Sequence, residues 1–122
     1  MDAIRLLLIA GTVLLAVAAL LGFVQERYRD QPALFAGWRV VHAGGTAGAV
    51  QLLALAAVWE QLAGAGLTSV LLACTLISVT WAFFLGPLAR VLGWLRIARL
   101  LNTVGAILAG PGYLALLVVL AV

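Results

Sequence analysis

Residues 37–48, GWRVVHAGGTAG, are the stretch from which both the fold and the function are predicted. This stretch opens the second of four long apolar segments and contains His42, the only histidine of the chain. A histidine inside hydrocarbon is costly and calls for a partner or a function. Glycines at positions 44, 45 and 48 leave the backbone bare beside it, so another helix or a flat ligand can approach closely.

The composition is typical of a protein that lies in a lipid bilayer. The chain has 122 residues, of which 66% are hydrophobic and 9% charged, with a mean hydropathy of +1.25. Soluble domains are about 45–50% apolar and about 25% charged. All seven basic residues are arginines near the ends of apolar segments, not a basic face, which argues against nucleic-acid binding. One histidine, one cysteine and no carboxylate cluster argue against divalent-metal and nucleophilic-triad enzymes.

Four apolar segments, at about 3–24, 34–59, 67–86 and 98–121, are each long enough to cross roughly 30 Å of hydrocarbon as a helix. We therefore predict that residues 1–122 form one all-α integral membrane domain, a four-helix up-down bundle. The first segment exceeds the roughly 7–15 apolar residues of a signal peptide, so we expect a retained helix. A bundle this small has little room inside for a ligand, which favours an oligomer with the ligand between chains.

Several local features refine this prediction. Gly86-Pro87 is expected to end the third helix, and Leu88–Leu100 to form a short amphipathic helix in the membrane interface. Pro111 is expected to kink the fourth helix. Cys74 is expected to be a small buried hydrophobic residue, with a thiolate iron ligand as the alternative.

The arginines predict the orientation in the membrane. Six of the seven flank the first and third loops, and only Arg5 belongs to the other side. The positive-inside rule then places these two loops in the cytoplasm and both termini outside. The six are Arg27, Arg29, Arg39, Arg90, Arg96 and Arg99.

Counting helical rise puts His42 about 10 Å below the cytoplasmic interface, in one predicted layer with other polar side chains. That layer contains Thr46, Ser78, Trp81 and Asn102. In it, the imidazole could simply hydrogen-bond to Asn102 or Ser78. A proton shuttle is disfavoured because all four acids lie at segment ends. The third role is axial ligation of a haem, whose propionates the nearby arginines could meet.

Helical spacing also assigns neighbours of His42 on the second segment. Trp38, Gly45 and Thr46 fall on the same face as His42. Gln51 lies roughly opposite and is expected to bond to a neighbouring helix. The hydroxyl groups of the third segment, Ser78 among them, can bond to their own backbone or join helices.

The pattern Gly-Trp-x-x-x-His-x-Gly at residues 37–44 resembles the second helix of styrene oxide isomerase and its relatives, small four-helix membrane proteins of bacteria. The resemblance implies that His42 binds haem b in a homotrimer with haems at the subunit interfaces, in the inner membrane. It implies a hydrophobic epoxide substrate, which ferric haem, as a Lewis acid on the epoxide oxygen, helps to rearrange to a carbonyl compound without net redox change. In this hypothesis the cofactor-binding residues are Trp38, Arg39, His42 and Gly45, and the catalytic polar residues are Thr46, Ser78 and Asn102.

The sequence departs from that family at its polar positions. The family has an asparagine six residues after the histidine, where this chain has Gly48. An acid and an amide flank the tryptophan of its third helix, where Val79 and Phe83 flank Trp81. Its functional tyrosine falls near Pro87. The iron ligand therefore carries over and the substrate-orienting groups do not.

These departures leave two other functions open. One is a haem protein without isomerase activity, and the other is a small transport or partner protein of the membrane. The small multidrug transporters have a similar size, but they need an acidic residue in the first helix, where this chain has only Arg5 as a charged residue.

Overall fold

The computed structural model describes residues 2–63 and 66–121, with side chains described as far as residue 118. It contains four helices, α1 (Ala3–Arg27), α2 (Pro32–Ala63), α3 (Leu67–Val91) and α4 (Leu95–Ala121). Each is long and apolar enough to cross a membrane, which fits a multi-pass membrane protein. The prediction of an all-helical chain with four membrane-length helices is confirmed.

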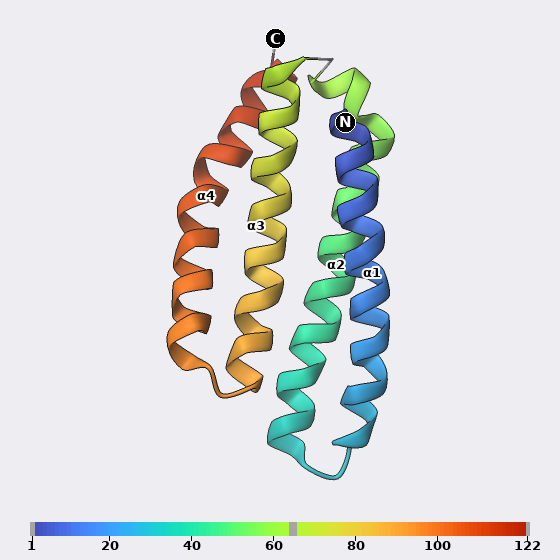
Figure 1. The fold of residues 1–122 in the computed structure, drawn as a ribbon, viewed down its shortest axis with the longest axis vertical. Helices are drawn as coiled ribbons and strands as arrows, with labels where there is room; N and C mark the ends of the chain where they lie inside the picture. Colours follow the sequence, from blue (N-terminus) through green and yellow to red (C-terminus); the bar gives the residue numbers. More distant parts are fainter. Residues whose placement is uncertain (1, 64–65, 122) are drawn as a thin grey trace.

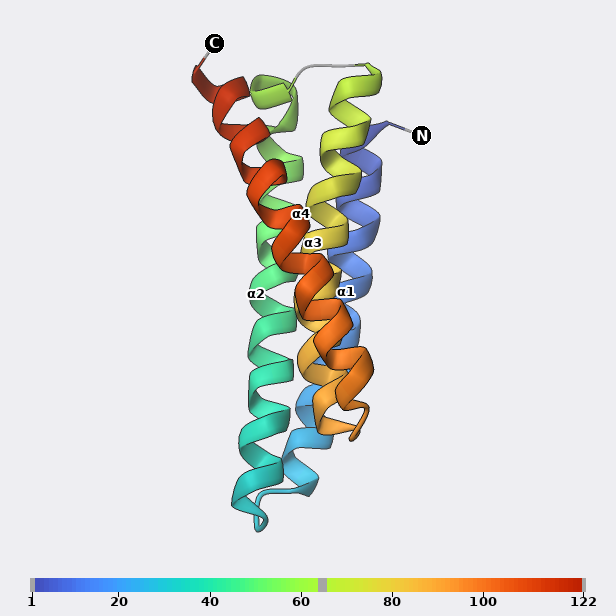
Figure 2. The same cartoon turned by 90° about the vertical axis from the view of Figure 1, so that its left-hand side faces the viewer.

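The helices lie side by side as two pairs (Figure 1). α1 packs most extensively against α2, and α3 packs most extensively against α4. Both termini lie at one end of the bundle, and the turns α1–α2 and α3–α4 lie at the other. Figure 2 shows that α4 runs obliquely across α3. Gln51 of α2 donates a hydrogen bond to the Tyr113 hydroxyl of α4. The two pairs are joined mainly by α2 against α3, then by α1 against α3, and least by α2 against α4.

Local sequence signals define the helix ends. The Asp2 side chain caps α1 by accepting a hydrogen bond of 2.8 Å from the backbone N–H of Arg5. Pro32 begins α2, where its missing N–H has no helical partner to lose. Gly93 has φ 82°, a backbone conformation that glycine adopts without strain, and it turns the chain between α3 and α4.

Two expectations about residues 86–100 are wrong. Gly86-Pro87 does not end α3, which continues to Val91, and Leu88–Leu100 is not a separate interfacial helix. Instead its first residues finish α3 and its last residues begin α4. A proline removes only one backbone donor, and membrane helices tolerate that loss where neighbouring helices pack against them. Gly86 and Ala89 are buried here, which indicates such packing.

The core runs along the centre of the bundle and contains a buried hydrogen bond between α2 and α3. Trp59 of α2 is 1% exposed and donates its indole N–H to the Ser69 hydroxyl of α3 at 2.7 Å. The largest fully buried side chains are Leu7, Leu14, Val41, Leu52, Trp59, Leu76 and Val79.

Cys74 differs from its prediction because it is exposed. It shares the outward face of α3 with Leu71 and Ser78, at spacings of three and four residues, and both are exposed. The expectation of a buried cysteine is therefore wrong, because an apolar segment in a bilayer protein can turn any face towards lipid.

Replacing Ser69 should destabilise the bundle. We expect Ser69→Ala to lower the free energy of unfolding by about 1–3 kcal/mol, because the buried Trp59 N–H loses its acceptor. SDS-induced unfolding of the detergent-solubilised protein measures the change. Ser78→Ala is the matched control, since the exposed Ser78 bonds only to the Cys74 carbonyl of its own helix. Equal stability of the two variants would contradict the structural role of the Trp59–Ser69 bond.

Candidate functional site

His42 is held against α1 by a hydrogen bond to main chain. Its Nδ1 lies 2.7 Å from the carbonyl oxygen of Ala18. A carbonyl can only accept, so Nδ1 donates, and in the neutral imidazole Nε2 then carries the lone pair. The ring lies over Gly22, where an added Cβ would come within 3.1 Å of the imidazole Cε1. Ala18 and Gly22 of α1 therefore fix the tautomer and the position of the ring.

The second ring nitrogen is the unusual feature of His42. Nε2 makes no hydrogen bond within residues 2–63 and 66–121, and the side chain is only half-buried. A polar nitrogen without a partner is unfavourable in hydrocarbon. Histidines that bind metal characteristically donate the other ring N–H to a carbonyl or carboxylate, as His42 does to Ala18. The donor chemistry thus fits an axial ligand, and one imidazole is enough for a haem iron.

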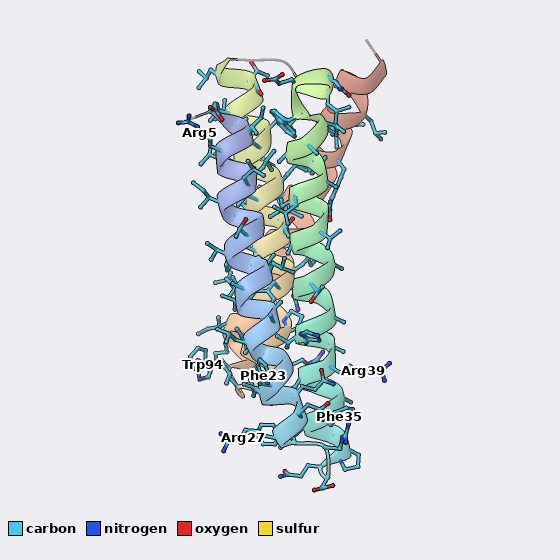
Figure 3. The ribbon with its side chains drawn as sticks, turned by 90° about the vertical axis from the view of Figure 1, so that its right-hand side faces the viewer. Arg5, Phe23, Arg27, Phe35, Arg39 and Trp94 are labelled. Atoms are coloured by element: carbon cyan, nitrogen blue, oxygen red, sulfur yellow. The ribbon has the colours of Figure 1, made fainter. Side chains whose placement is uncertain are left out.

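His42 is half-buried, and no described cavity accounts for its exposed part. His42 does not line any of the best-formed cavities of the described residues. On the same side of α2, Arg39 and Ala43 are exposed, and Figure 3 shows Arg39 pointing away from the bundle. A group of porphyrin size at Nε2 would therefore lie against the outer surface of the α1–α2 pair. The described residues hold no cluster of three or more histidine, cysteine or acidic side chains that could bind a metal ion in another way.

The predicted polar layer around His42 is not assembled. Thr46 donates to the His42 backbone carbonyl at 2.9 Å, but Ser78 donates to the Cys74 carbonyl at 2.8 Å. Asn102 lies over Gly86, between α3 and α4. Neither Ser78 nor Asn102 hydrogen-bonds to His42. Helical rise predicts the depth of a residue but not which helices pack together. The imidazole of His42 contacts Ala18 and Gly22 of α1.

Three predicted cofactor-binding residues have different surroundings. Trp38 is buried and stacks on Tyr28, with ring centroids 6.2 Å apart, so it ties the start of α2 to the end of α1. Gly45 is buried too, and a Cβ there would lie 2.9 Å from both Ala18 and Phe84. Of the three, only Arg39 is exposed and free to meet a ligand.

A crevice of about 240 Å³ lies on the other side of α2, facing α3 and α4. Gln51 Nε2 donates to the Tyr113 hydroxyl oxygen at 2.5 Å, which confirms that Gln51 bonds to a neighbouring helix. The phenol hydrogen of Tyr113 is then free to donate, and it has no acceptor in the described part of the chain. The lining residues are Gly44, Ala47, Gly48, Gln51, Val79, Thr80, Phe83, Phe84 and Tyr113.

Tyr113 was not among the predicted site residues. Its depth, near the far end of α4, separated it from the layer of His42. Gln51 is the residue of the sequence that could have pointed to Tyr113, because an amide within an apolar helix requires a polar partner on another helix.

No family model, curated protein or solved structure matches this chain.

Enlarging Gly45 should loosen the support of His42. We expect Gly45→Ala to cost about 1–3 kcal/mol of unfolding free energy, because the methyl group would overlap Ala18, whose carbonyl holds the imidazole. Gly44→Ala is the control, since a Cβ there meets nothing within 4 Å. Thermal unfolding in detergent compares the two variants, and an unchanged Gly45→Ala protein would refute the tight contact.

Proposed function

We propose that this chain is a membrane-embedded haem protein, with His42 as axial ligand, that rearranges a lipid-soluble epoxide to a carbonyl compound. The observation that carries the proposal is the imidazole bonded through Nδ1 to the Ala18 carbonyl, with Nε2 left without a partner. That arrangement leaves the Nε2 lone pair of the neutral imidazole available to a ligand.

The proposed setting is the inner membrane of a bacterium, crossed four times in up-down order. The turn end of the bundle carries Arg27, Arg39 and Trp94, while Arg5 lies at the end with the termini (Figure 3). Arg5 is also paired with Asp2. The positive-inside rule favours cytoplasmic turns and external termini.

A haem on the outer surface of the α1–α2 pair would need a cover, which favours an oligomer. The family resemblance suggests a homotrimer with haem b between subunits. Bound at Nε2, haem b would supply a Lewis-acidic iron for an epoxide oxygen. In this proposal Arg39, one helical turn before His42 and exposed, would pair with a propionate.

The crevice is the proposed substrate site. Gly48, Val79 and Phe83, three of the four positions where the sequence departs from the isomerase family, line it. These small or apolar residues favour a more apolar substrate. The polar groups left are Gln51 and Tyr113, and the free phenol hydrogen of Tyr113 can donate to a substrate oxygen.

The residues around the crevice have distinct roles in this proposal. Gln51 positions the Tyr113 hydroxyl through its hydrogen bond. Thr80 donates to the Leu76 carbonyl, so its proton is already used. Phe83 and Phe84 provide apolar walls that keep water from a cationic intermediate. Gln51 lies nine residues after His42 and therefore on the opposite face of α2. A substrate in the crevice of one chain would thus have to meet the haem held by another chain.

Optical absorbance tests the ligand. We expect the purified, haem-supplemented protein to show a Soret band that His42→Ala loses, because the only histidine of the chain is then gone. Thr12→Ala, an exposed polar position of α1, is the control and should keep the band. A wild-type protein without a Soret band, or a His42→Ala variant with an undiminished one, would exclude this function.

Turnover tests the crevice. We expect Tyr113→Phe to slow conversion of styrene oxide or a terpenoid epoxide to its carbonyl product by about 10²-fold, because a donor to the developing oxyanion is removed. The Soret band should not change, since Tyr113 does not hold the haem. Product is measured by gas chromatography, and equal rates for Tyr113→Phe and wild type would contradict the assignment.

The second candidate is a haem protein without isomerase activity. The apolar residues at Gly48, Val79 and Phe83 favour it, because they remove the polar groups of the related enzymes. A Soret band together with no conversion of any epoxide would select this function.

A further inference from the structure

A second polar pocket opens where α3 ends and α4 begins. It has a volume of about 240 Å³ and is lined by Arg90, Leu95, Ala98, Arg99 and Asn102. Arg90 comes from the last turn of α3, while Arg99 and Asn102 lie one turn apart on α4. Two guanidinium groups from different helices and one amide therefore meet around one small space.

These three side chains have no partner within the described residues. The ion pairs of that part of the chain join Arg5 to Asp2 and Arg29 to Glu26. Neither Arg90 nor Arg99 has an ion pair or a side-chain hydrogen bond there, and the Asn102 amide has no hydrogen bond. Two positive charges without a counter-charge, in a pocket partly walled by protein, attract an anion.

Gly86 sets the position of the amide. A Cβ added to Gly86 would overlap the Asn102 side-chain oxygen, so the amide lies directly over bare backbone of α3. The contact keeps the Asn102 side chain against α3, where it lines the pocket together with the two arginines. This arrangement explains why Asn102, a polar residue on an apolar helix, lies far from the imidazole.

We propose that this pocket binds a phosphate group, that of an anionic phospholipid headgroup. The planar guanidinium group of arginine matches phosphate oxygens with two parallel hydrogen bonds, and the asparagine N–H₂ adds a third donor. Trp94, 58% exposed in the adjoining turn and labelled in Figure 3, is an aromatic side chain suited to the headgroup level. Basic pockets between membrane helices are characteristic sites for anionic headgroups.

Exposed apolar side chains beside the pocket suit the rest of a lipid. Leu92 and Leu95 are 46% and 55% exposed next to the arginines, so an acyl chain could lie along them. A free phosphate ion would use the arginines but not these leucines, which favours the lipid. The inference does not involve His42 or a haem, so it stands or falls separately from the isomerase proposal.

Native mass spectrometry of the full-length protein, titrated with phosphatidylglycerol or phosphatidylcholine in detergent, tests the site. We expect Arg90→Gln and Arg99→Gln each to weaken phosphatidylglycerol binding about five-fold, the contribution of one basic residue near an anionic surface. Phosphatidylcholine binding should not change. Arg96→Gln is the matched control, because it removes the same charge from the same region without lining the pocket. An equal loss in Arg96→Gln would overturn the pocket in favour of a diffuse field.

Three further measurements separate the site from its alternatives. Gly86→Ala keeps both arginines but displaces the end of the Asn102 side chain, and we expect binding to weaken two- to three-fold; an unchanged affinity would remove Asn102 from the site. Inorganic phosphate is added without lipid: weak or absent binding supports the headgroup, while binding that Arg90→Gln abolishes would assign the pocket to the free ion instead. Arg90→Lys, with the charge kept, should lose less than Arg90→Gln and guards against misfolding.

Discussion

The hydrogen bond between His42 and the Ala18 carbonyl is the constraint on which the proposed chemistry depends. It uses one nitrogen of the imidazole and, because a carbonyl has no proton to give, leaves the other with its lone pair. The bond also requires α1 and α2 to approach closely, which Gly22 and Gly45 permit by having no side chain. The close packing of α1 against α2 and the hydrogen bond that fixes the tautomer of His42 therefore depend on each other.

The same pairing separates the functional features of the chain. The imidazole lies at the α1–α2 contact, the Gln51–Tyr113 crevice lies between the pairs, and the arginine pocket lies at the α3–α4 turn. Each feature has hydrogen-bonding capacity that is not used within the described residues. Association with other molecules, whether copies of this chain, lipids or small ligands, can satisfy such capacity in a membrane.

Hydropathy and length were sufficient to predict the four helices, because crossing hydrocarbon requires long apolar runs. They could not predict which helix covers His42, since depth along a helix says nothing about its neighbours. Pro87 misled the prediction of the third helix because tertiary packing outweighed the loss of one backbone bond. The partner of Gln51 was foreseeable in kind but not in identity, because helical spacing within α2 does not say which side chain of another helix faces Gln51. The burial of Cys74 was predicted wrongly because, in a membrane helix, apolar residues lie on the lipid-facing surface as well as in the core.

The exposure of Cys74 has a practical consequence. The sequence contains a single thiol, and it lies on the outward face of α3, away from the imidazole and the crevice. A nitroxide attached to it would report once per chain without any engineered substitution. Dipolar spectroscopy between such labels in a bilayer would then give the number and spacing of neighbouring copies directly.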